Sequence, residues 1–350
     1  MHIVVVGAGL AGSFFAYYLA DSEHTVTLLD HTMPREKPCG GGIPARVFAK
    51  FPDLANLSCA YHSPHIFRYI SSDGKETTIP ISGQFFVVSR RDFDAAILQQ
   101  VIQKGHNIRL IQERVTAVEF RSPHWYVRTP QREIVADVLI GADGASSLVR
   151  KQILGATPPE HYAFTVGYFI TNVPLDTLII RTYNDLEGYL WYFPRSDHAS
   201  VGIGCRRGRG LPKESWARLN NFLAQYYPSA EKYQRWGAIV PSFSDPHLLR
   251  LPCAGPNWAL LGDAAGHANP ITGEGIYYAL TSAYLAAQAI LVSQSIQDYD
   301  RLWRVEYGYG PTLTSVGSFV SKLHNIEKAF AYKGYEMALK RAFLLDFEGR

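Results

Sequence analysis

The chain has 350 residues, of which 47% are hydrophobic and 19% are charged, a mixture typical of a globular protein and not of a disordered one. Its net charge of only +3 gives no electrostatic reason to expect a nucleic-acid partner. The four cysteines are scattered without a CxxC pair, so we expect neither a metal site nor a disulfide framework, and a reducing, cytoplasmic compartment fits.

The first element is an apolar strand, His2–Val6, which indicates a buried strand and not a signal peptide, because no basic region or cleavage site accompanies it. Gly7, Gly9 and Gly12 then form a GxGxxG pattern before a predicted helix, and Asp30 ends the following strand. These glycines would permit a tight turn and the close approach of a pyrophosphate, while Asp30 could accept hydrogen bonds from a ribose diol. The unit predicts a dinucleotide site, and a strand-turn-helix without a ligand is the alternative.

Three consecutive glycines, Gly40, Gly41 and Gly42, follow Cys39 in the segment "KPCGGGIP". Each glycine loses more backbone freedom on folding than any other residue, so a run of three needs a reason. The run indicates that another group comes so close to this backbone that no side chain fits. A flexible loop without any contact is the alternative.

The next elements alternate between helical and strand patterns. A helix is expected over about 91–104, where the apolar side chains share one face, and strand-like alternation follows over 106–144. Between about 155 and 250, short apolar runs separated by turns predict an antiparallel sheet, followed by a helix near 213–227. The stretch 277–292 is apolar but is interrupted by polar residues, so it is not expected to span a membrane.

Two later turns each place an aspartate after a buried strand and a glycine. Asp143 lies in "IGADGASSLVR" and Asp263 lies in "LLGDAAGHANPITGEGI", which leads into a long predicted helix. An aspartate in such a turn can bind a sugar hydroxyl, and the helix N-terminus can face a group that becomes anionic. Each aspartate could instead simply cap its turn.

The three motifs, in this order and spacing, resemble those of FAD-dependent oxidoreductases built like p-hydroxybenzoate hydroxylase. Within that group, "KPCGGGIP", "RRDFD", "YLWYFP" and "GDAAGHANPITGEGIYYAL" resemble the geranylgeranyl reductase family. The resemblance implies FAD as the cofactor and an isoalloxazine ring lying against the three glycines. The cofactor-binding residues that we expect are Gly7, Gly9, Gly12, Asp30, Gly40, Gly41, Gly42, Arg90, Val115, Asp143, Asp263, Pro270, Gly273, Gly275 and Ile276.

The expected fold is α/β, with a Rossmann-like FAD-binding domain, an inserted antiparallel-sheet substrate domain and a helical C-terminal segment. We expect a discontinuous FAD-binding domain over 1–60, 85–155 and 250–310. The substrate domain is expected over 61–84 and 156–249, and C-terminal helices over 311–350.

Members of the resembled family reduce isolated isoprenoid double bonds, which requires a proton on one carbon and a hydride on the other. Tyr189, Trp191 and Phe193 occupy alternate positions of one strand, so they share one face, which would wall the substrate cavity or only pack the core. With Tyr189 and Trp191, Cys39 is a candidate for the catalytic site, as a proton donor or a positioning group; a buried cysteine without chemistry is equally expected. An FAD-dependent hydroxylase is the alternative function, ahead of a halogenase or a non-catalytic flavoprotein.

The substrate and the electron source leave further alternatives. Arg206 and Arg207, in "CRRGRG", could hold an anionic head group on an isoprenoid or other apolar substrate, although a solvated basic loop is favoured. No second GxGxxG unit is found, so NAD(P)H would bind transiently or an electron-donor protein would supply the electrons. The basic and apolar residues of 321–341 suggest peripheral contact with the inner membrane surface, and a solvated helix explains them equally well.

Overall fold

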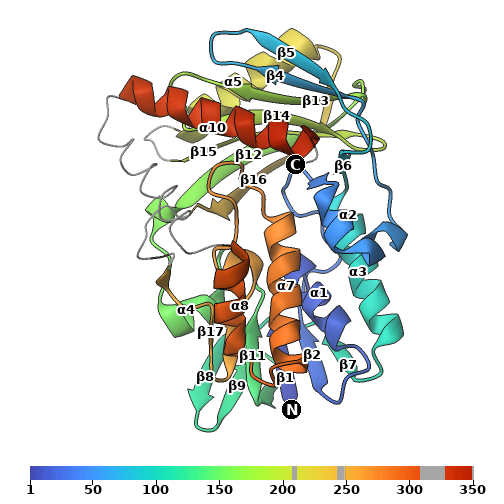
Figure 1. Cartoon of the computed structure of the whole chain (residues 1–350), viewed down its shortest axis with the longest axis vertical. Coiled ribbons are helices and arrows are strands. Elements are labelled where there is room, and N and C mark those ends of the chain that lie inside the picture. Colours follow the sequence, from blue (N-terminus) through green and yellow to red (C-terminus); the bar gives the residue numbers. More distant parts are fainter. Residues whose placement is uncertain (207–210, 243–247, 249, 308–327, 349–350) are drawn as a thin grey trace.

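The computed structural model describes residues 1–206, 211–242, 248, 250–307 and 328–348, and for 211–212, 328–332 and 345–348 it describes the backbone alone. Arg207 of the predicted substrate site lies outside these ranges. Two sheets are stacked along the long axis of the protein, a parallel one around the N-terminus and a mainly antiparallel one at the opposite end (Figure 1). The candidate site lies between them.

Six strands form the first sheet in the order β17-β18-β11-β1-β2-β7, and β17 is antiparallel to β18. Side chains of β1 alternate between two apolar clusters, with Ile3 and Val5 on one face and Val4 and Val6 on the other. A parallel strand buried on both faces is expected to be continuously apolar, as the sequence of β1 is. The bounds are β1 (His2–Val6), β2 (Thr25–Leu29), β7 (Ile108–Ile111), β11 (Val138–Gly141), β17 (Ala254–Gly255) and β18 (Trp258–Leu260).

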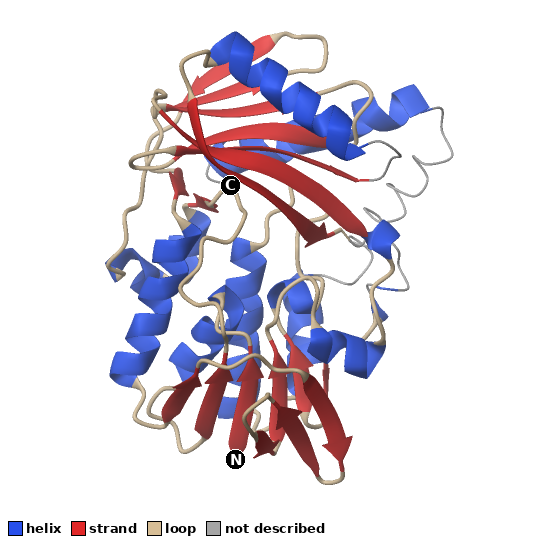
Figure 2. Ribbon diagram, turned by 180° about the vertical axis from the view of Figure 1, so that it is seen from behind, coloured by secondary structure: helices blue, strands red, loops and turns tan. Residues whose placement is uncertain are grey.

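Helices cover one face of the parallel sheet, and a small three-stranded sheet covers the other (Figure 2). The helical layer consists of α1 (Leu10–Leu19), α3 (Arg90–Lys104), α7 (Ile276–Leu291) and α8 (Asp298–Tyr307). The opposite layer consists of β8 (Ala117–Arg121), β9 (His124–Arg128), β10 (Glu133–Ala136) and α4 (Leu148–Leu154). In the described part of the chain, no helix combines the length and the apolarity needed to cross a bilayer.

The second sheet has seven strands in the order β16-β12-β15-β14-β13-β4-β5, and its neighbours are antiparallel except β4 and β13. Strands β12 to β15 agree with the short strands predicted from the sequence, whereas β16 was not predicted. Helix α5 (Leu211–Tyr226) packs on one face and α10 (Lys328–Glu348) lies across the other (Figures 1 and 2). The bounds are β4 (Ile66–Ile70), β5 (Glu76–Pro80), β12 (Tyr162–Thr171), β13 (Thr177–Thr182), β14 (Gly188–Pro194), β15 (Ala199–Arg206) and β16 (Glu231–Pro241).

Short elements connect the two layers. A two-stranded sheet joins β3 to β6, so that the segment after Gly41 pairs with the segment before α3. These elements are β3 (Gly42–Pro44), α2 (Arg46–Lys50), η1 (Pro52–Asn56), β6 (Phe85–Val87), η2 (Pro159–His161) and η3 (Gly262–Ala264). The assignment of exact domain boundaries stays a prediction.

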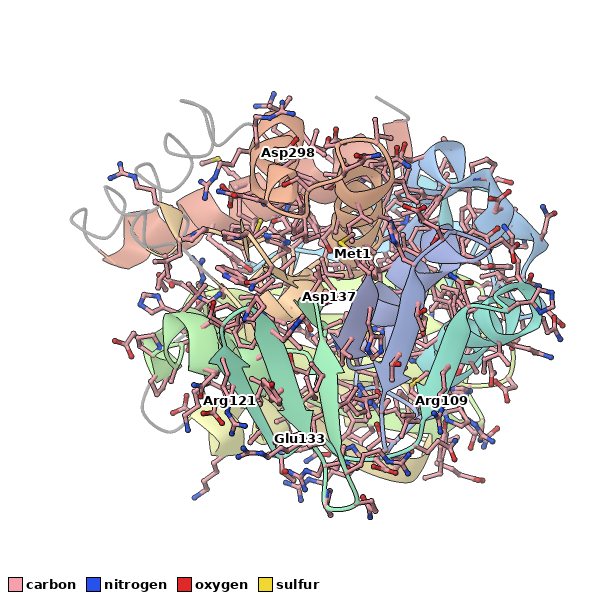
Figure 3. All side chains as sticks on the ribbon, turned by 90° about the horizontal axis from the view of Figure 1, so that it is seen from below. Met1, Arg109, Arg121, Glu133, Asp137 and Asp298 are labelled. Atoms are coloured by element: carbon pink, nitrogen blue, oxygen red, sulfur yellow. The ribbon has the colours of Figure 1, made fainter. Side chains whose placement is uncertain are left out.

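The two ends of the parallel strands have different surroundings. Met1, Arg109 and Asp137 lie near the amino ends of β1, β7 and β11 and are seen from below in Figure 3. The carboxyl ends of β1 and β11 point the other way, toward the second sheet, and lead into Gly7 and Ala142. Ligands of open α/β sheets bind beyond the carboxyl ends of the strands, so this edge is where a site is expected.

Glycines on the second sheet make room for two indole rings. A Cβ added at Gly202 would lie 2.4 Å from Cζ2 of Trp191, and one added at Gly167 would lie 2.2 Å from Cζ2 of Trp236. The two rings themselves are stacked, with centroids 5.8 Å apart. The rings therefore lie flat on bare backbone, and side chains at these positions would displace them.

We predict that Gly202→Ala destabilises the protein by ~1–3 kcal/mol, because the new methyl group overpacks against Trp191. Gly237→Ala is the matched control, since its Cβ would meet nothing closer than 3.6 Å. Urea unfolding followed by tryptophan fluorescence compares the two variants. Equal stability of both variants would contradict this account of the close packing.

Candidate functional site

One elongated cavity runs between the two sheets and collects most of the residues predicted from the sequence. It begins at the first turn after β1 and ends under α10, at Tyr335 and Phe343. Predicted site residues that line it are Gly9, Cys39, Gly40, Gly41, Gly42, Arg90, Tyr189, Trp191, Phe193, Arg206, Asp263, Pro270, Gly273, Gly275 and Ile276. Their separation along the chain shows that the fold, and not local sequence, brings them together.

The three glycines of the first turn have different surroundings. A Cβ at Gly7 would lie 2.4 Å from the carbonyl oxygen of Ala142, and one at Gly12 would lie 1.9 Å from the carbonyl oxygen of Gly7. At Gly9 the nearest atom would be Nη2 of Arg35, 3.8 Å away. Gly7 and Gly12 therefore allow the turn and the helix to pack closely, while Gly9 leaves its backbone open to the cavity.

Asp30, Val115 and Asp143 lie outside the cavity lining. Asp30 accepts hydrogen bonds from the backbone N–H of Ala8 at 2.9 Å and from that of Thr32 at 2.8 Å, so both carboxylate oxygens have protein partners. Val115 packs at the edge of the apolar cluster beneath β8 and β9. The contacts that these residues would make with a cofactor stay predictions.

Asp143 caps the short helix α4. Its carboxylate accepts hydrogen bonds from the hydroxyl of Ser147 and from the backbone N–H of Leu148 at 2.7 Å. Burial raises the pKa of Asp143, and the hydrogen bonds from Ser147 and the α4 backbone act in the opposite direction. The structure therefore assigns Asp143 at least the capping role that the sequence left open.

A second helix N-terminus faces the same cavity. Helix α7 begins after Gly275, which like Gly9 before α1 provides no side-chain cap. The preceding loop is held by Asn269, whose Oδ1 accepts hydrogen bonds from the backbone N–H groups of Ile271 and Thr272 at 2.9 and 3.1 Å. Two helix dipoles therefore direct their positive ends into one cavity, which favours anionic groups there.

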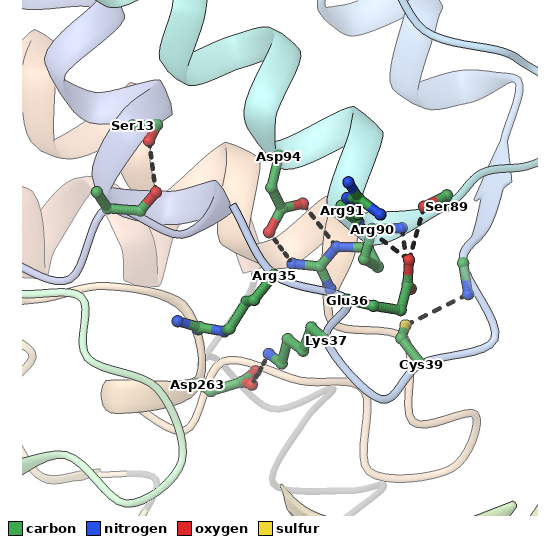
Figure 4. Close-up of polar contacts among 12 residues, drawn as sticks. Ser13, Arg35, Glu36, Lys37, Cys39, Ser89, Arg90, Arg91, Asp94 and Asp263 are labelled. Carbon is green, nitrogen blue, oxygen red and sulfur yellow. Dashed lines mark hydrogen bonds and ion pairs between the residues drawn. The ribbon is translucent and has the colours of Figure 1, made fainter. Parts of the chain in front are cut away.

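Two ion pairs lie near the N-terminus of α7, one of which involves Asp263. Nζ of Lys37 donates a 2.7 Å hydrogen bond to Oδ2 of Asp263 (Figure 4). Arg46 forms a 2.6 Å ion pair with Glu274, whose other oxygen has no hydrogen-bond partner among the described residues. Burial raises the pKa of Glu274, while Arg46 opposes that shift.

Protein atoms already exclude side chains at the three consecutive glycines. A Cβ at Gly40 would lie 2.6 Å from the ring of Phe193, and one at Gly42 would lie 2.5 Å from the ring of Phe85. Gly41 has a φ of +82° and a Cβ there would lie 2.1 Å from the carbonyl oxygen of Val88. The loop is thus pressed between β14 and β6, which explains the glycines without any ligand; their contact with a flavin stays a prediction.

Glu36 and Arg195 hold the glycine loop in place. The Arg195 side chain is only 1% exposed, and its guanidinium donates to Oε1 of Glu36 at 3.0 Å and to the carbonyl oxygen of Cys39 at 3.1 Å. The hydroxyl of Ser200 donates to the same carbonyl at 3.0 Å. Because two donors hold one carbonyl, the backbone before the glycines has little freedom.

Glu36 also caps α3. It accepts hydrogen bonds from the hydroxyl of Ser89 at 2.6 Å and from the backbone N–H groups of Arg90 and Arg91 at 3.2 Å (Figure 4). A carboxylate at the start of a helix is stabilised by the free N–H groups and by the dipole. The loop, α3 and the end of β14 therefore share one carboxylate.

Arg90 and Cys39 lie together on the wall of the cavity. The guanidinium of Arg90 makes two hydrogen bonds with Asp94, at 2.7 and 2.6 Å, and the pair is buried. The thiol of Cys39 accepts a 3.3 Å hydrogen bond from the backbone N–H of Gly41. Asp94 balances the charge of Arg90 and fixes its guanidinium next to Cys39.

Tyr189, Trp191 and Phe193 do share one face of β14, as the alternation predicted, and Leu190 and Tyr192 point to the opposite cluster. The hydroxyl of Tyr189 donates to the carbonyl oxygen of Thr272, and burial raises the pKa of this phenol. A tyrosine in this state remains protonated and ties the sheet to the loop before α7.

Where β12, β15 and β16 line the cavity, small residues lie beside two charged ones, Arg206 at the end of β15 and Glu187 just before β14. Nε of Arg206 donates a 2.5 Å hydrogen bond to the hydroxyl of Ser242, and both residues line the cavity. Tyr335 and Phe343 of α10 also line the cavity and were not singled out from the sequence. Lys37, Glu36, Arg195 and Glu274 were also missed, because isolated charges beside glycines or turns resemble solvated residues.

The residues present fit FAD. The backbone at Gly9 is open to the cavity, two uncapped helix N-termini face it, and Lys37, Arg35 and Arg90 line it, each held in an ion pair with a carboxylate. These groups would hold a pyrophosphate and an isoalloxazine that becomes anionic on reduction. Beyond the three glycines, the lining is largely aromatic and apolar, with Arg206, Glu187 and Ser242 as its polar members, as a hydrocarbon chain with a polar head group would require.

Comparisons with known proteins agree with this site. The profile of the pyridine nucleotide-disulphide oxidoreductase family matches residues 1–170. The chain is 32% identical over 311 residues to the geranylgeranyl diphosphate reductase of Rhodobacter capsulatus, covering 82% of this chain and 74% of that protein. It is 29% identical over 327 residues to the menaquinone reductase of Mycolicibacterium smegmatis, covering 86% and 78% of the two chains.

Solved structures show the same fold. A geranylgeranyl bacteriochlorophyll reductase-like protein from Thermoplasma acidophilum superposes with a TM-score of 0.73 at 19% identity, covering 96% of this chain and 87% of that one. A probable FAD-dependent monooxygenase from Pseudomonas aeruginosa superposes with a TM-score of 0.70 at 18% identity, covering 96% and 99%. At these identities the likeness establishes the fold alone.

We predict that Arg195→Met destabilises the protein by about 3–5 kcal/mol, because it leaves the Glu36 carboxylate without its buried cation. Arg218→Met is the control, since Arg218 pairs with a largely exposed Asp185 and its loss should cost less than about 1 kcal/mol. Urea unfolding measures both. The double variant Glu36→Gln, Arg195→Met should lose less than the sum of the single losses; additive losses would contradict the coupling.

Proposed function

The chain belongs to the geranylgeranyl reductase family of FAD-dependent oxidoreductases, and from this premise we propose that it reduces isolated carbon–carbon double bonds in the prenyl chain of a lipid or prenyl diphosphate. The observation that carries the proposal is the continuity of the cavity. A single space joins two uncapped helix N-termini, suited to FAD, to an aromatic groove suited to an uncharged chain.

Bound FAD, once reduced, supplies the hydride for one alkene carbon. The residues of this chain orient the alkene, exclude water and provide the proton for the other carbon. Tyr189, Trp191 and Phe193 form the wall beside the glycine loop, where they would hold a planar alkene. Because Tyr189 already donates to the carbonyl of Thr272, its part is to position and not to protonate.

We assign Cys39 as the proton donor or positioning group. Its thiol lies on the cavity wall beside Gly40–Gly42, the segment proposed to contact the isoalloxazine. The backbone carbonyl of Cys39 is held by Arg195 and Ser200, so the position of the thiol is defined by fixed backbone. Such preorganisation is what general acid catalysis needs.

We further assign Arg206 to the anionic head group of the substrate. It lies at the end of β15, where the lining residues Ala163, Gly204 and Ala238 form a floor of small side chains. A guanidinium suits phosphate because it offers parallel donors. The neighbouring Arg207 keeps the same predicted role but lies outside the described residues.

We also propose an electron source for the FAD and a location for the protein in the cell. NAD(P)H in a transient encounter, or an electron-donor protein, would reduce the FAD, since the described residues contain one βαβ dinucleotide unit. A cytoplasmic location with peripheral membrane contact would suit a prenyl lipid. Within α10, Lys333 and Arg341 are exposed, but Leu339 is buried against the sheet and is not available to a membrane.

The first test is an anaerobic single turnover. The FAD-loaded protein is reduced by light and mixed with geranylgeranyl diphosphate, and the flavin absorbance and product mass are followed. We expect oxidised flavin to return without oxygen while the product gains two hydrogen atoms for each double bond reduced. The fully saturated diphosphate is the control and should leave the flavin reduced.

Other outcomes of this experiment separate the alternatives. A substrate that is unchanged without oxygen but hydroxylated in air would replace the proposal with a monooxygenase. An FAD that binds but cannot be reduced would indicate a non-catalytic flavoprotein. A protein that does not bind FAD would contradict the assignment of the cavity.

We predict that Cys39→Ala keeps its FAD but slows reoxidation of the reduced flavin by the alkene about 10²–10⁴-fold, the range of general acid catalysis. Cys39→Ser should fall between wild type and Ala. Cys59→Ala is the matched control, because Cys59 is also half-buried but is not part of the cavity lining. If the reduced flavin of Cys39→Ala is reoxidised by the alkene at the wild-type rate, Cys39 has only a packing role.

A further inference from the structure

We propose that Phe343 of α10 sets the length of the prenyl chain that the cavity accepts. The inference rests on the proposed function for the class of substrate, and it adds a residue that determines specificity within that class. Phe343 comes from the last described helix, about 300 residues away in sequence from the glycine loop that lines the same cavity.

Phe343 is the apolar end wall. Its side chain is 5% exposed and its ring lies 6.2 Å from that of Phe67, nearly parallel to it. On its other side the ring contacts Tyr189 edge-on, with centroids 5.8 Å apart. Phe343 therefore occupies the space on the sheet directly beside a residue of the proposed substrate wall.

The apolar surface continues behind Phe343. Phe67 of β4 and Ile180 of β13 belong to the same apolar cluster as Leu339 and Phe343 of α10, and that helix lies across this face of the sheet (Figure 1). Removing the ring of Phe343 would extend the cavity toward these apolar side chains. Arg206, the residue proposed to bind the head group, lies at the end of β15, on the other side of β14 from β13 and β4, so a chain held there would run past Tyr189 toward Phe343.

Polar contacts hold the end wall in place. The carboxylate of Glu336 accepts hydrogen bonds from the backbone N–H and the hydroxyl of Ser72 and from the hydroxyl of Thr182, each at 2.8 Å. The hydroxyl of Tyr335 donates a 2.8 Å hydrogen bond to the carbonyl oxygen of Ile271, in the loop before α7. Since α10 is tied to both the sheet and this loop, a longer chain cannot simply push the helix aside.

A hydrophobic pocket discriminates chains by the room it offers at the end. One methylene too many or too few changes selectivity by roughly 10-fold or more. A phenyl ring is similar in size to one isoprene unit, so its loss should admit a chain longer by about one unit.

The test measures binding without turnover. Dissociation constants of the oxidised, FAD-loaded protein are obtained by tryptophan quenching for a series of prenyl diphosphates that differ by one isoprene unit. In Phe343→Ala, the ratio of the dissociation constants for the longest chain bound by wild type and for the next longer chain should shift by at least ~10-fold toward the longer one. Met337→Ala, which changes a side chain 68% exposed on the same helix, should leave the ratio unchanged.

Phe343→Leu and Tyr335→Phe complete the experiment. Phe343→Leu should shift the ratio in the same direction but less, and it keeps the test valid if the alanine variant does not fold. Tyr335→Phe keeps the ring, so it should leave the length preference unchanged while it raises the dissociation constants of all the chains. An unchanged ratio in a folded, FAD-loaded Phe343 variant overturns the inference.

The two proposals can fail separately. If the ratio shifts but no variant reduces any chain anaerobically, α10 sets chain length and the proposed reaction is wrong. If wild type reduces the chains but the ratio is the same in both Phe343 variants, the reaction stands and the assignment of Phe343 is wrong.

Discussion

The ion pair between the buried Arg195 and the partly buried Glu36 connects the parts of the structure that form the site. Glu36 lies in the loop before the glycines and caps α3, while Arg195 follows β14 and holds the carbonyl of Cys39. Withdrawing these charges from water is costly, and the cost is offset because backbone N–H groups and a hydroxyl fill the remaining carboxylate positions. A single carboxylate therefore links the glycine loop, helix α3 of the first layer and the end of β14 in the second sheet.

The aromatic wall of the cavity follows from the placement of glycines opposite its rings. Phe193 lies against Gly40 and Trp191 against Gly202, each too close for a Cβ, and Trp191 stacks in turn on Trp236. Rings that rest on bare backbone have little rotational freedom and present a flat apolar surface. The shape of the groove is thus fixed by contacts between backbone and ring, which do not depend on polar groups in a lining that must accept a hydrocarbon.

Sequence patterns that extend over only a few residues predicted the local structure correctly. The GxGxxG turn, the strand before it and the shared face of Tyr189, Trp191 and Phe193 follow from spacings of a few residues, and the structure has them. The strand β16 was missed because its first five residues are exposed at the edge of the sheet, so its sequence is polar and lacks an apolar alternation.

The supporting residues of the site could not be predicted, because their signals are not local. Arg195 stands in "PRSDH", where a charge after a strand suggests a solvated turn, yet it is the most deeply buried arginine of the described chain. Glu36, with which Arg195 forms the ion pair, lies 159 residues earlier in the chain. Other groups do lie close to the glycines of the loop, but these groups are the rings of Phe193 and Phe85 and the backbone of Val88, which only the fold brings near; contact with the flavin stays a prediction.

The interleaving of the two sheets determines the order in which the protein can become stable during synthesis. Strand β4 leaves the ribosome long before β13, the parallel neighbour with which it pairs, and β1 and β11 are complete before β18 exists. The second sheet is complete only at Pro241 and the first only at Leu260, and the apolar face under α10 stays open until that helix is made. Such long-range pairing slows folding and leaves strand edges exposed to other chains. A nascent chain of this protein therefore exposes unpaired strand edges and an apolar sheet face for most of its synthesis, and its two sheets gain stability together and late.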